Sequence, residues 1–327
     1  MKLLRSQITI NGYYFDFVNE VEVNSSWDMV TDTAKIIIPK KLTFEGKPIV
    51  AGLNSLFKRG DPVEINLGYG ETLYNVFSGY ISAIKPKLPI EITCDDQMYL
   101  LKKKLIKSKA YKSVTLKNLL DDIVGTTLPF ETNFDMKLEN FRISNATVAQ
   151  VLEEIRKDYG VVSFVRQGTL YVGFAYLEKL RKEHKFDFQK NVVSTDDLEY
   201  RRLDDIKIKV KATSIKTGEK NKKNKKIEIE LGDPDGETRT LHYYNKTEEQ
   251  LRQIAQQELV KLKYEGYFGS FEAFGEPFVQ HSDVAVITNQ KLPETEGKYL
   301  VKSVNRTFGQ GGYRQKIQLD RKISGQL

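Results

Sequence analysis

Alternation of apolar and polar residues is the feature that most constrains the fold of this chain. It runs through the first hundred residues, as in VEINLGY, and returns from about residue 196 to the C-terminal end, in short segments punctuated by glycine, proline and asparagine. A period of two places successive side chains on opposite faces of a strand. The sequence therefore predicts two blocks of antiparallel strands, each forming a small barrel or sandwich.

A helical pattern separates these two blocks. Ser113 or Thr115 can cap the N-terminus of a first helix, and Gly160 can end a second one. The apolar residues recur at helical spacing: Leu116, Leu119, Leu120 and Ile123 in the first helix, and Val148, Val151, Leu152 and Ile155 in the second. Two short strands about Gln167 and Gly168 follow, which predicts a compact α+β module here.

The predicted fold class is α+β, mainly β: two antiparallel β-barrels flanking an α/β module. We expect a first β-barrel domain at residues 1–98, an α+β module at 99–195 and a second β-barrel domain at 196–327. The second barrel carries an inserted helix at about 246–264, and Thr247 followed by acidic residues marks its N-terminus.

The net charge of +7 favours a polyanionic partner, but much of the excess lies in one segment, Lys216–Lys226. This segment joins two alternating runs and contains neither arginine nor an aromatic residue, which nucleic-acid sites use for bidentate contacts and stacking. We interpret it as the solvated tip of a long hairpin and predict no specific nucleic-acid partner.

Gly68 and Gly70 form a G-x-G arrangement after a strand, as in phosphate-binding loops. A dinucleotide fingerprint needs a third glycine where this chain has Leu73, and then a helix, whereas the strand pattern continues. The two glycines therefore predict a turn or bulge in a β-hairpin.

The residues that most often carry chemistry are few and scattered. His184, His242 and His281 match no metal-binding spacing and are predicted to be surface or turn histidines. Cys94 has no partner for a disulfide and is predicted to be a buried strand residue.

The acidic residues also indicate caps and turns rather than catalytic or metal-binding sites. Asp95 and Asp96 follow a strand and are expected to cap local N–H groups, and residues 232–238 (GDPDGET) form a turn signal rather than a calcium loop. A glycosidase carboxylate pair stays open, because its two acids can come from anywhere in a chain. The sequence predicts no catalytic, cofactor-binding or metal-binding residue, and a protein that is not an enzyme.

Aromatic side chains on the strands can supply contact area between subunits. We expect about half of them to be core residues instead. The candidates are Tyr13, Tyr14, Tyr69, Tyr74, Phe268, Phe271 and Phe274.

Three stretches, in this order, resemble the baseplate hub proteins of contractile phage tails. They lie at residues 63–104 (from VEINLGYGETLYNVFSGYISAIKP to IEITCDDQMYLLKKK), 114–174 and 269–321 (from GSFEAFGEPFVQHSDVAVITN to GKYLVKSVNRTFGQGGYRQKIQLDR). The chain resembles the late-control (gene D) type of hub, the hubs of Mu-like and T-even phages, and the amino-terminal half of type VI secretion spike proteins.

The resemblance implies a structural role. In that family each subunit has two similar β-barrels joined by α/β elements, and three subunits form a ring of pseudo-sixfold symmetry between a hexameric tail tube and a trimeric spike. It implies a homotrimer with tail tube and spike partners, and tape-measure and baseplate wedge proteins as further candidates. Because the sequence ends after the last barrel strands at Leu327, we expect the spike to be a separate chain and no lysin domain to be attached.

The expected location is the baseplate of a virion tail or of an equivalent injection particle. No run of about 18 apolar residues occurs, which predicts no membrane insertion, and the N-terminal segment lacks a secretory signal. We therefore expect synthesis in a bacterial cytoplasm. The alternatives left open are a distal tail-tip hub of a non-contractile tail, a hub-associated peptidoglycan hydrolase and a basic nucleic-acid-binding protein.

Overall fold

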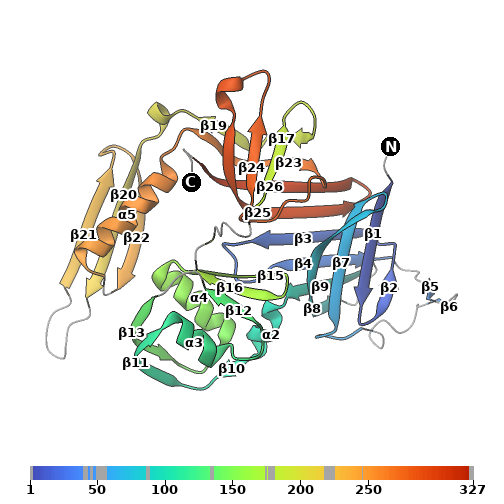
Figure 1. Cartoon of the computed structure of the whole chain (residues 1–327), viewed down its shortest axis with the longest axis horizontal. Coiled ribbons are helices and arrows are strands. Elements are labelled where there is room, and N and C mark those ends of the chain that lie inside the picture. Colours follow the sequence, from blue (N-terminus) through green and yellow to red (C-terminus); the bar gives the residue numbers. More distant parts are fainter. Residues whose placement is uncertain are drawn as a thin grey trace.

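The computed structural model describes residues 3–39, 43–44, 47–48, 57–85, 89–132, 136–173, 175, 181–216, 225–244 and 246–323. Within these residues the chain is mainly β, with four α-helices and one large sheet of fourteen strands (Figure 1). The prediction of a mainly β chain with antiparallel strands at both ends is confirmed. Closure of each half into a barrel remains a prediction.

The first half of the large sheet is built from the N-terminal residues. Its strand order is β3-β4-β9-β8-β7-β1-β2, and every pair is antiparallel. The strands are β1 (Leu4–Ile10), β2 (Tyr13–Phe15), β3 (Glu20–Ser26), β4 (Thr33–Ile38), β7 (Pro62–Tyr69), β8 (Thr72–Lys85) and β9 (Ile90–Asp96). The short pair β5 (Thr43–Phe44) and β6 (Lys47–Pro48) lies outside this sheet.

The second half of the same sheet comes from the C-terminal part of the chain. The strands are β17 (Glu183–Asp187), β18 (Val192–Ser194), β19 (Leu198–Arg201), β23 (Gly266–Phe274), β24 (Val284–Thr288), β25 (Gly297–Gly309) and β26 (Gly312–Lys322). Two 3₁₀ turns lie at Leu203–Asp205 and Pro293–Thr295. Strand β25 pairs antiparallel with β3, from Ser303 opposite Ser26 to Gly309 opposite Glu20, so the two halves form one continuous sheet.

The α+β module packs beside the first half, in the lower part of Figure 1. It contains α2 (Met98–Lys103), β10 (Leu105–Ile106), β11 (Lys109–Thr115), α3 (Leu116–Ile123), β12 (Phe130–Thr132), β13 (Lys137–Ile143), β14 (Ala146–Thr147), α4 (Val148–Tyr159), β15 (Val162–Arg166) and β16 (Thr169–Gly173). Thr115 caps α3, Gly160 ends α4 at φ +69°, and all eight predicted apolar residues of the two helices are buried. Both predicted helices are confirmed.

Trp27 joins this module to the large sheet. Its side chain follows β3, is 7% exposed and packs against Val162 and Phe164 of β15. Helix α2 also contacts β8 and β9 directly. The module is therefore held against the sheet by apolar packing.

A separate three-stranded sheet carries the predicted inserted helix. Strands β21 (Lys225–Gly232) and β22 (Glu237–Tyr244) flank β20 (Ile208–Lys216), and α5 (Glu248–Leu262) packs on one face of this sheet. Thr247 caps α5, as predicted. The insertion is thus larger than a helix, because β20 to β22 pair with one another and not with the large sheet. Most of the Lys216–Lys226 segment lies outside the described residues.

Strands β17 and β18 connect the middle of the chain to its C-terminal half. β17 pairs in parallel with β24, and β18 pairs antiparallel with β23. Residues 183–194, assigned to the α+β module by the sequence pattern, are therefore hydrogen-bonded to the second half of the large sheet. The division into three domains remains a prediction.

The G-x-G segment is the turn of the β7–β8 hairpin. Gly70 has φ +59° between the paired residues Tyr69 and Thr72. A Cβ atom on Gly68 would lie 1.9 Å from the carbonyl oxygen of Thr72, so the strands can approach here only with glycine. The prediction of a hairpin turn is confirmed.

Candidate functional site

The same turn precedes a strand in both halves of the large sheet. In the first half, the backbone N–H of Lys58 donates to the Asp61 carboxylate at 2.9 Å. The N–H of Gly60 donates to the carbonyl of Ile81 at 2.8 Å, and the N–H of Ile81 donates to the carbonyl of Asp61 at 2.9 Å. The turn therefore fixes the start of β7 against the middle of β8.

The second copy of this turn has the same bonds. The N–H of Gln280 donates to the Asp283 carboxylate at 2.9 Å. The N–H of Ser282 donates to the carbonyl of Val301 at 2.8 Å, and the N–H of Val301 donates to the carbonyl of Asp283 at 2.9 Å. Ser282 has φ +67°, and its counterpart Gly60 has φ +94°.

The strands around the two turns also correspond. Strand β8 changes register against β9 after Ile81, and β25 changes register against β26 after Val301. The strand order is β4-β9-β8-β7 around the first turn and β23-β26-β25-β24 around the second, and all pairs are antiparallel. One four-stranded unit with its entry turn thus occurs twice in the chain.

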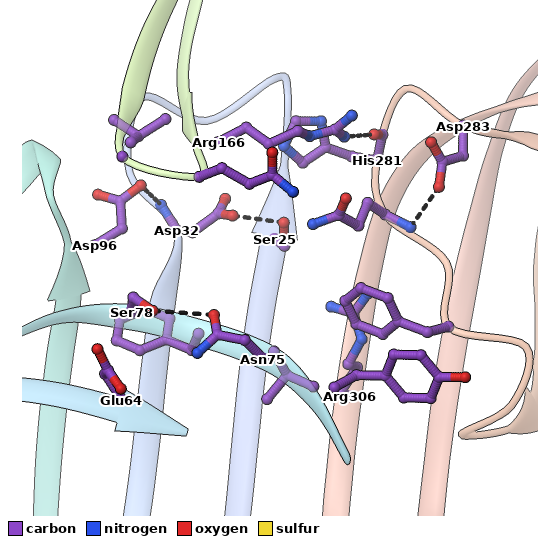
Figure 2. Close-up of a pocket in the computed structure, with 18 of the residues that line it drawn as sticks. Ser25, Asp32, Glu64, Asn75, Ser78, Asp96, Arg166, His281, Asp283 and Arg306 are labelled. Carbon is purple, nitrogen blue, oxygen red and sulfur yellow. Dashed lines mark hydrogen bonds between the residues drawn. The ribbon is translucent and has the colours of Figure 1, made fainter. Parts of the chain in front are cut away.

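A cavity of about 690 Å³ lies where the two halves of the sheet meet the β15–β16 hairpin (Figure 2). Its walls include the second copy of the repeated turn. Its buried ionisable lining residues are Asp96, Arg166, His281, Asp283 and Arg306, and its exposed lining residues include Glu64, Asn75, Gln167 and Lys182. The cavity is therefore charged at its floor and open to solvent at its mouth.

Two carboxyl groups form one wall. The hydroxyl of Ser25 and the N–H of Ser26 donate to Asp32, at 2.5 and 3.0 Å. The N–H groups of Asp32 and Met98 donate to Asp96, at 3.2 and 2.9 Å. Asp96 thus accepts a bond from local backbone, as predicted for the Asp95–Asp96 pair.

These two carboxyl groups hold protons more tightly than solvated ones. Burial raises the pKa of Asp32 to about 6, against the opposing effect of its bonds to Ser25 and Ser26. Burial and the nearby charge of Asp32 raise the pKa of Asp96 well above its usual value.

Two arginines from different strands also line the cavity. Arg166 Nη2 donates to the carbonyl of His281, and Arg306 Nη2 donates to that of Val279. The Arg306 guanidinium also lies 4.7 Å from the centroid of the Phe278 ring. Both arginines therefore hold the loop that leads into the second repeated turn.

The histidines take three different positions. His281 lies in the second turn, as predicted, but it is 2% exposed, and burial together with Arg166 and Arg306 lowers its pKa well below the usual value. His184 Nε2 is 3.0 Å from an Asp283 oxygen, and His242 lies exposed on β22. No group of three or more His, Cys, Asp or Glu side chains suited to a metal ion occurs within the described ranges.

The other singled-out residues have structural positions. Cys94 is buried, as predicted, and burial raises the pKa of its thiol to about 12. Asp233 closes the predicted turn by accepting the N–H of Ile208 at 3.0 Å, and it pairs with Lys263. No helix of the described chain is both long and apolar enough to cross a membrane.

The predicted contact aromatics divide between core and surface. Phe271 is 1% exposed, whereas Tyr14 and Phe274 are 50% and 40% exposed. The remainder are half-buried: Tyr13, Tyr69, Tyr74 and Phe268. Tyr69 and Tyr74 contact the C-terminal half, since the Tyr69 hydroxyl donates to the carbonyl of Tyr313 at 2.9 Å and Tyr74 stacks on Phe278.

Loss of either turn carboxylate should destabilise the chain. Asp61→Ala leaves the N–H of Lys58 without its acceptor, at a cost of about 1–3 kcal/mol in the free energy of unfolding. Asp283→Ala should cost more, because Asp283 also accepts the N–H of Lys182 and contacts His184. Urea denaturation measures both. A large cost at one aspartate and none at the other would contradict the structural equivalence of the turns.

Asp32→Asn should change how stability depends on pH. The pKa of Asp32 is about 6 in the folded chain and 3.8 for a solvated aspartate, the value expected in the unfolded chain. Between about pH 4 and 6 the folded chain therefore binds more protons at this group than the unfolded chain does. The stabilisation that comes from this extra proton is fully present below about pH 4. It is lost as the pH rises through 6, the pKa of Asp32 in the folded chain. Asparagine removes the charge and can still bond to Ser25 and Ser26, so the variant should be about 1–2 kcal/mol more stable at pH 7.5.

Urea denaturation at pH 4.5 and 7.5 tests this pH dependence. The advantage of Asp32→Asn over the unaltered chain should shrink at the lower pH. The exposed Asp16→Asn is the charge-matched control. An equal advantage at both pH values would show that the buried charge of Asp32 is not its cause.

The sequence alone did not single out the cavity. Its charged residues lie far apart in the chain, from Asp32 to Arg306, and no local spacing links them. The repeated turn has a weak signal, since KRGD (58–61) and QHSD (280–283) share only an aspartate directly before an alternating strand. That aspartate before an alternating strand is the sequence signal that could have indicated the repeat.

Comparison with known proteins identifies the fold. No family model matches the sequence. No curated protein matches it either. Among solved structures, a tail protein from Neisseria meningitidis MC58 is similar with a TM-score of 0.68 at 13% identity, over 98% of this chain and 97% of that one.

Two further structures extend this similarity. The 43 kDa tail protein of prophage MuSo2 from Shewanella oneidensis has a TM-score of 0.65 at 16% identity, over 98% of each chain. An Escherichia coli component of the type VI secretion system, described as similar to T4 bacteriophage tail proteins, has a TM-score of 0.58 at 10% identity, over 97% of this chain and 77% of that one. The resemblance predicted from the sequence is confirmed: the chain has the fold of phage tail proteins and of this type VI secretion component.

Proposed function

We propose that this chain is a structural baseplate hub protein of a phage tail or a phage-like contractile injection system. Three copies form a ring of pseudo-sixfold symmetry, which joins a hexameric tail tube to a central trimeric spike carried by a separate chain. The role is geometric and involves no catalysed reaction. We also propose that the chain consists of a first β-barrel domain at residues 1–98, an α+β module at 99–195 and a second β-barrel domain at 196–327.

The repeated four-stranded unit is the observation that carries the proposal. Two copies in one chain give six similar units in a trimer, and six similar units can contact a sixfold partner in nearly equivalent ways. The copies differ in their surroundings, because the α+β module packs beside the first and the β20–β22 sheet is inserted before the second. A trimer therefore keeps true threefold symmetry on any face where these differences are exposed.

The similar proteins support the location. One is a tail protein, and another is the tail protein of a prophage. The third is a component of a type VI secretion system and is described as structurally similar to T4 bacteriophage tail proteins. Contractile machines of this kind place a tube against a spike, and an adaptor must match the symmetry of both. We infer that this chain is located at the tail baseplate and that its partners are tube and spike proteins.

The mass of the assembly in solution tests the proposal. Sedimentation equilibrium at micromolar concentration should give three times the mass of the chain, and electron micrographs should show rings with six similar lobes. A stable monomer that forms no ring, alone or with tube and spike proteins present, would count against the hub function.

A further inference from the structure

Arg306 is an almost fully buried cation with few partners. Its side chain is 2% exposed and lines the cavity at the junction of the two sheet halves. A guanidinium has five N–H donors. Arg306 donates one of them to the carbonyl of Val279, and the Tyr313 side chain also interacts with its charge. Its buried Nε has no partner of good hydrogen-bond geometry in the described structure. The cavity therefore contains donor capacity that the chain does not use.

Arg166 adds a second guanidinium to the same cavity, from the β15–β16 hairpin (Figure 2). It is 6% exposed and donates to the carbonyl of His281. Among the residues that the structure describes, neither guanidinium forms a salt bridge. The charges of Asp32 and Asp283 act on both guanidinium groups through space, but in the described chain neither carboxylate is hydrogen-bonded to them. Guanidinium donors without a partner in the chain can bind an anion from outside.

The carboxylates of the cavity influence the arginines by their charge but do not hydrogen-bond to them, because their oxygens accept other bonds. Asp32 accepts from Ser25 and Ser26, and Asp96 accepts from the N–H groups of Asp32 and Met98. The Asp283 carboxylate accepts the N–H groups of Lys182 and Gln280 and contacts His184. The acids are therefore held by their own turns, while the arginine donors remain unmatched.

The mouth of the cavity admits a ligand and offers it further donors. Gln167 and Lys182 are exposed and line the opening. No hydrogen bond of the Gln167 or Gln280 side-chain amide is found in the described part of the chain, so both amides are available to a ligand. A volume of about 690 Å³ exceeds the needs of a single water molecule many times over.

We propose that this cavity binds an oxyanion, a sulfate-like or carboxylate group, between the guanidinium groups of Arg166 and Arg306. Planar guanidinium groups match the geometry of such groups, and a buried site strengthens the contact. The bound anion would connect the α+β module, through Arg166, to the second sheet half, through Arg306. The inference does not depend on the proposed ring.

Thermal unfolding of the full chain with added anions tests the site. Sodium sulfate and sodium malonate are titrated separately against sodium chloride at matched ionic strength, and the two arms distinguish an inorganic oxyanion from a carboxylate. A saturable rise in the unfolding temperature with either anion is expected. Sulfate also stabilises proteins without binding, so only the part of the rise that a site variant removes counts.

Gln167→Glu is the variant of choice, because Gln167 is exposed and the change places a negative charge at the mouth. It should weaken the apparent affinity about tenfold through charge repulsion. Gln256→Glu on α5 makes the same change at an exposed position outside the cavity and should bind as the unaltered chain does. The proposal would be overturned if the unfolding temperature rose equally in the unaltered chain, Gln167→Glu and Gln256→Glu. It would also be overturned if neither anion gave a saturable rise.

Asp32→Asn gives an independent readout. Sulfate keeps its charge between pH 5.5 and 7.5, so a change in its affinity over this range reports on the protein. Affinity should increase at the lower pH in the unaltered chain, because protonation removes the negative charge of Asp32 near the site. The variant should show a smaller change in sulfate affinity between the two pH values, and any change that remains reports on His184, which also lines the cavity. Tighter binding at pH 7.5 than at pH 5.5 in the unaltered chain would contradict the site.

Discussion

Gly275→Ala is expected to lower the free energy of unfolding by about 3 kcal/mol or more. A Cβ atom at this position would lie 2.0 Å from a ring carbon of Tyr313, which is fully buried. The backbone cannot easily move away, because the N–H of Gly275 donates to the carbonyl of Tyr313 at 3.1 Å and lies 3.2 Å from the Tyr69 hydroxyl. Overpacking of a well-packed interior costs about 1–3 kcal/mol and more where the backbone is fixed.

Gly311→Ala is the matched control. No atom lies within 4 Å of the position that its Cβ would occupy, so the same substitution meets open space. Urea denaturation of both variants should show a large loss for Gly275→Ala and a change of less than about 0.5 kcal/mol for Gly311→Ala. Similar values for the two would mean that Tyr313 does not pack against Gly275.

Phe271→Ala should cost about 3–5 kcal/mol, the usual range for truncating a buried phenylalanine. Phe271 is 1% exposed on β23, and its ring packs edge-on against Phe186 of β17, with centroids 4.9 Å apart. Truncation leaves a cavity between a strand from the middle of the chain and the second half of the sheet. The expected result is a lower urea midpoint with an unchanged m-value.

Phe274→Ala controls for the loss of an aromatic ring on the same strand. Phe274 is 40% exposed and lies 4.8 Å from the Arg314 guanidinium, a surface contact worth about 0.5–1 kcal/mol. If Phe271→Ala and Phe274→Ala lowered the free energy of unfolding by similar amounts, the packing of β17 against β23 would be contradicted.

Local signals explain why much of the fold could be predicted. Strand alternation, the Gln167–Gly168 turn, and the caps Thr115, Thr247 and Gly160 all act within a few residues. Each of them satisfies or restricts the backbone where it occurs, so the sequence alone carries the information.

Pairings between distant segments could not be predicted in the same way. Nothing in residues 20–26 indicates that β3 pairs with β25 rather than with another alternating strand. The same holds for β20 to β22, whose pattern equals that of the large sheet although they form a sheet of their own. A period of two determines which face a side chain occupies, and it does not determine the partner strand.

The candidate site depends on such distant pairings. Arg166 and Arg306 are 140 positions apart in the numbering and meet only because the β15–β16 hairpin packs where the sheet halves join. Buried arginines in alternating strands look like solvent-facing residues in a sequence. Their burial follows from tertiary packing, which no local pattern records.

The pairing of β3 with β25 also affects how the chain folds during synthesis. Ser26 at the end of β3 pairs with Ser303 of β25, so the ribosome adds about 280 residues between the two partners. Because synthesis proceeds at roughly 5–20 residues per second, this edge of β3 remains unpaired for roughly 15–60 s. An unpaired strand edge is a template for aggregation. Nascent chains of this protein therefore expose this edge of β3 during most of their synthesis.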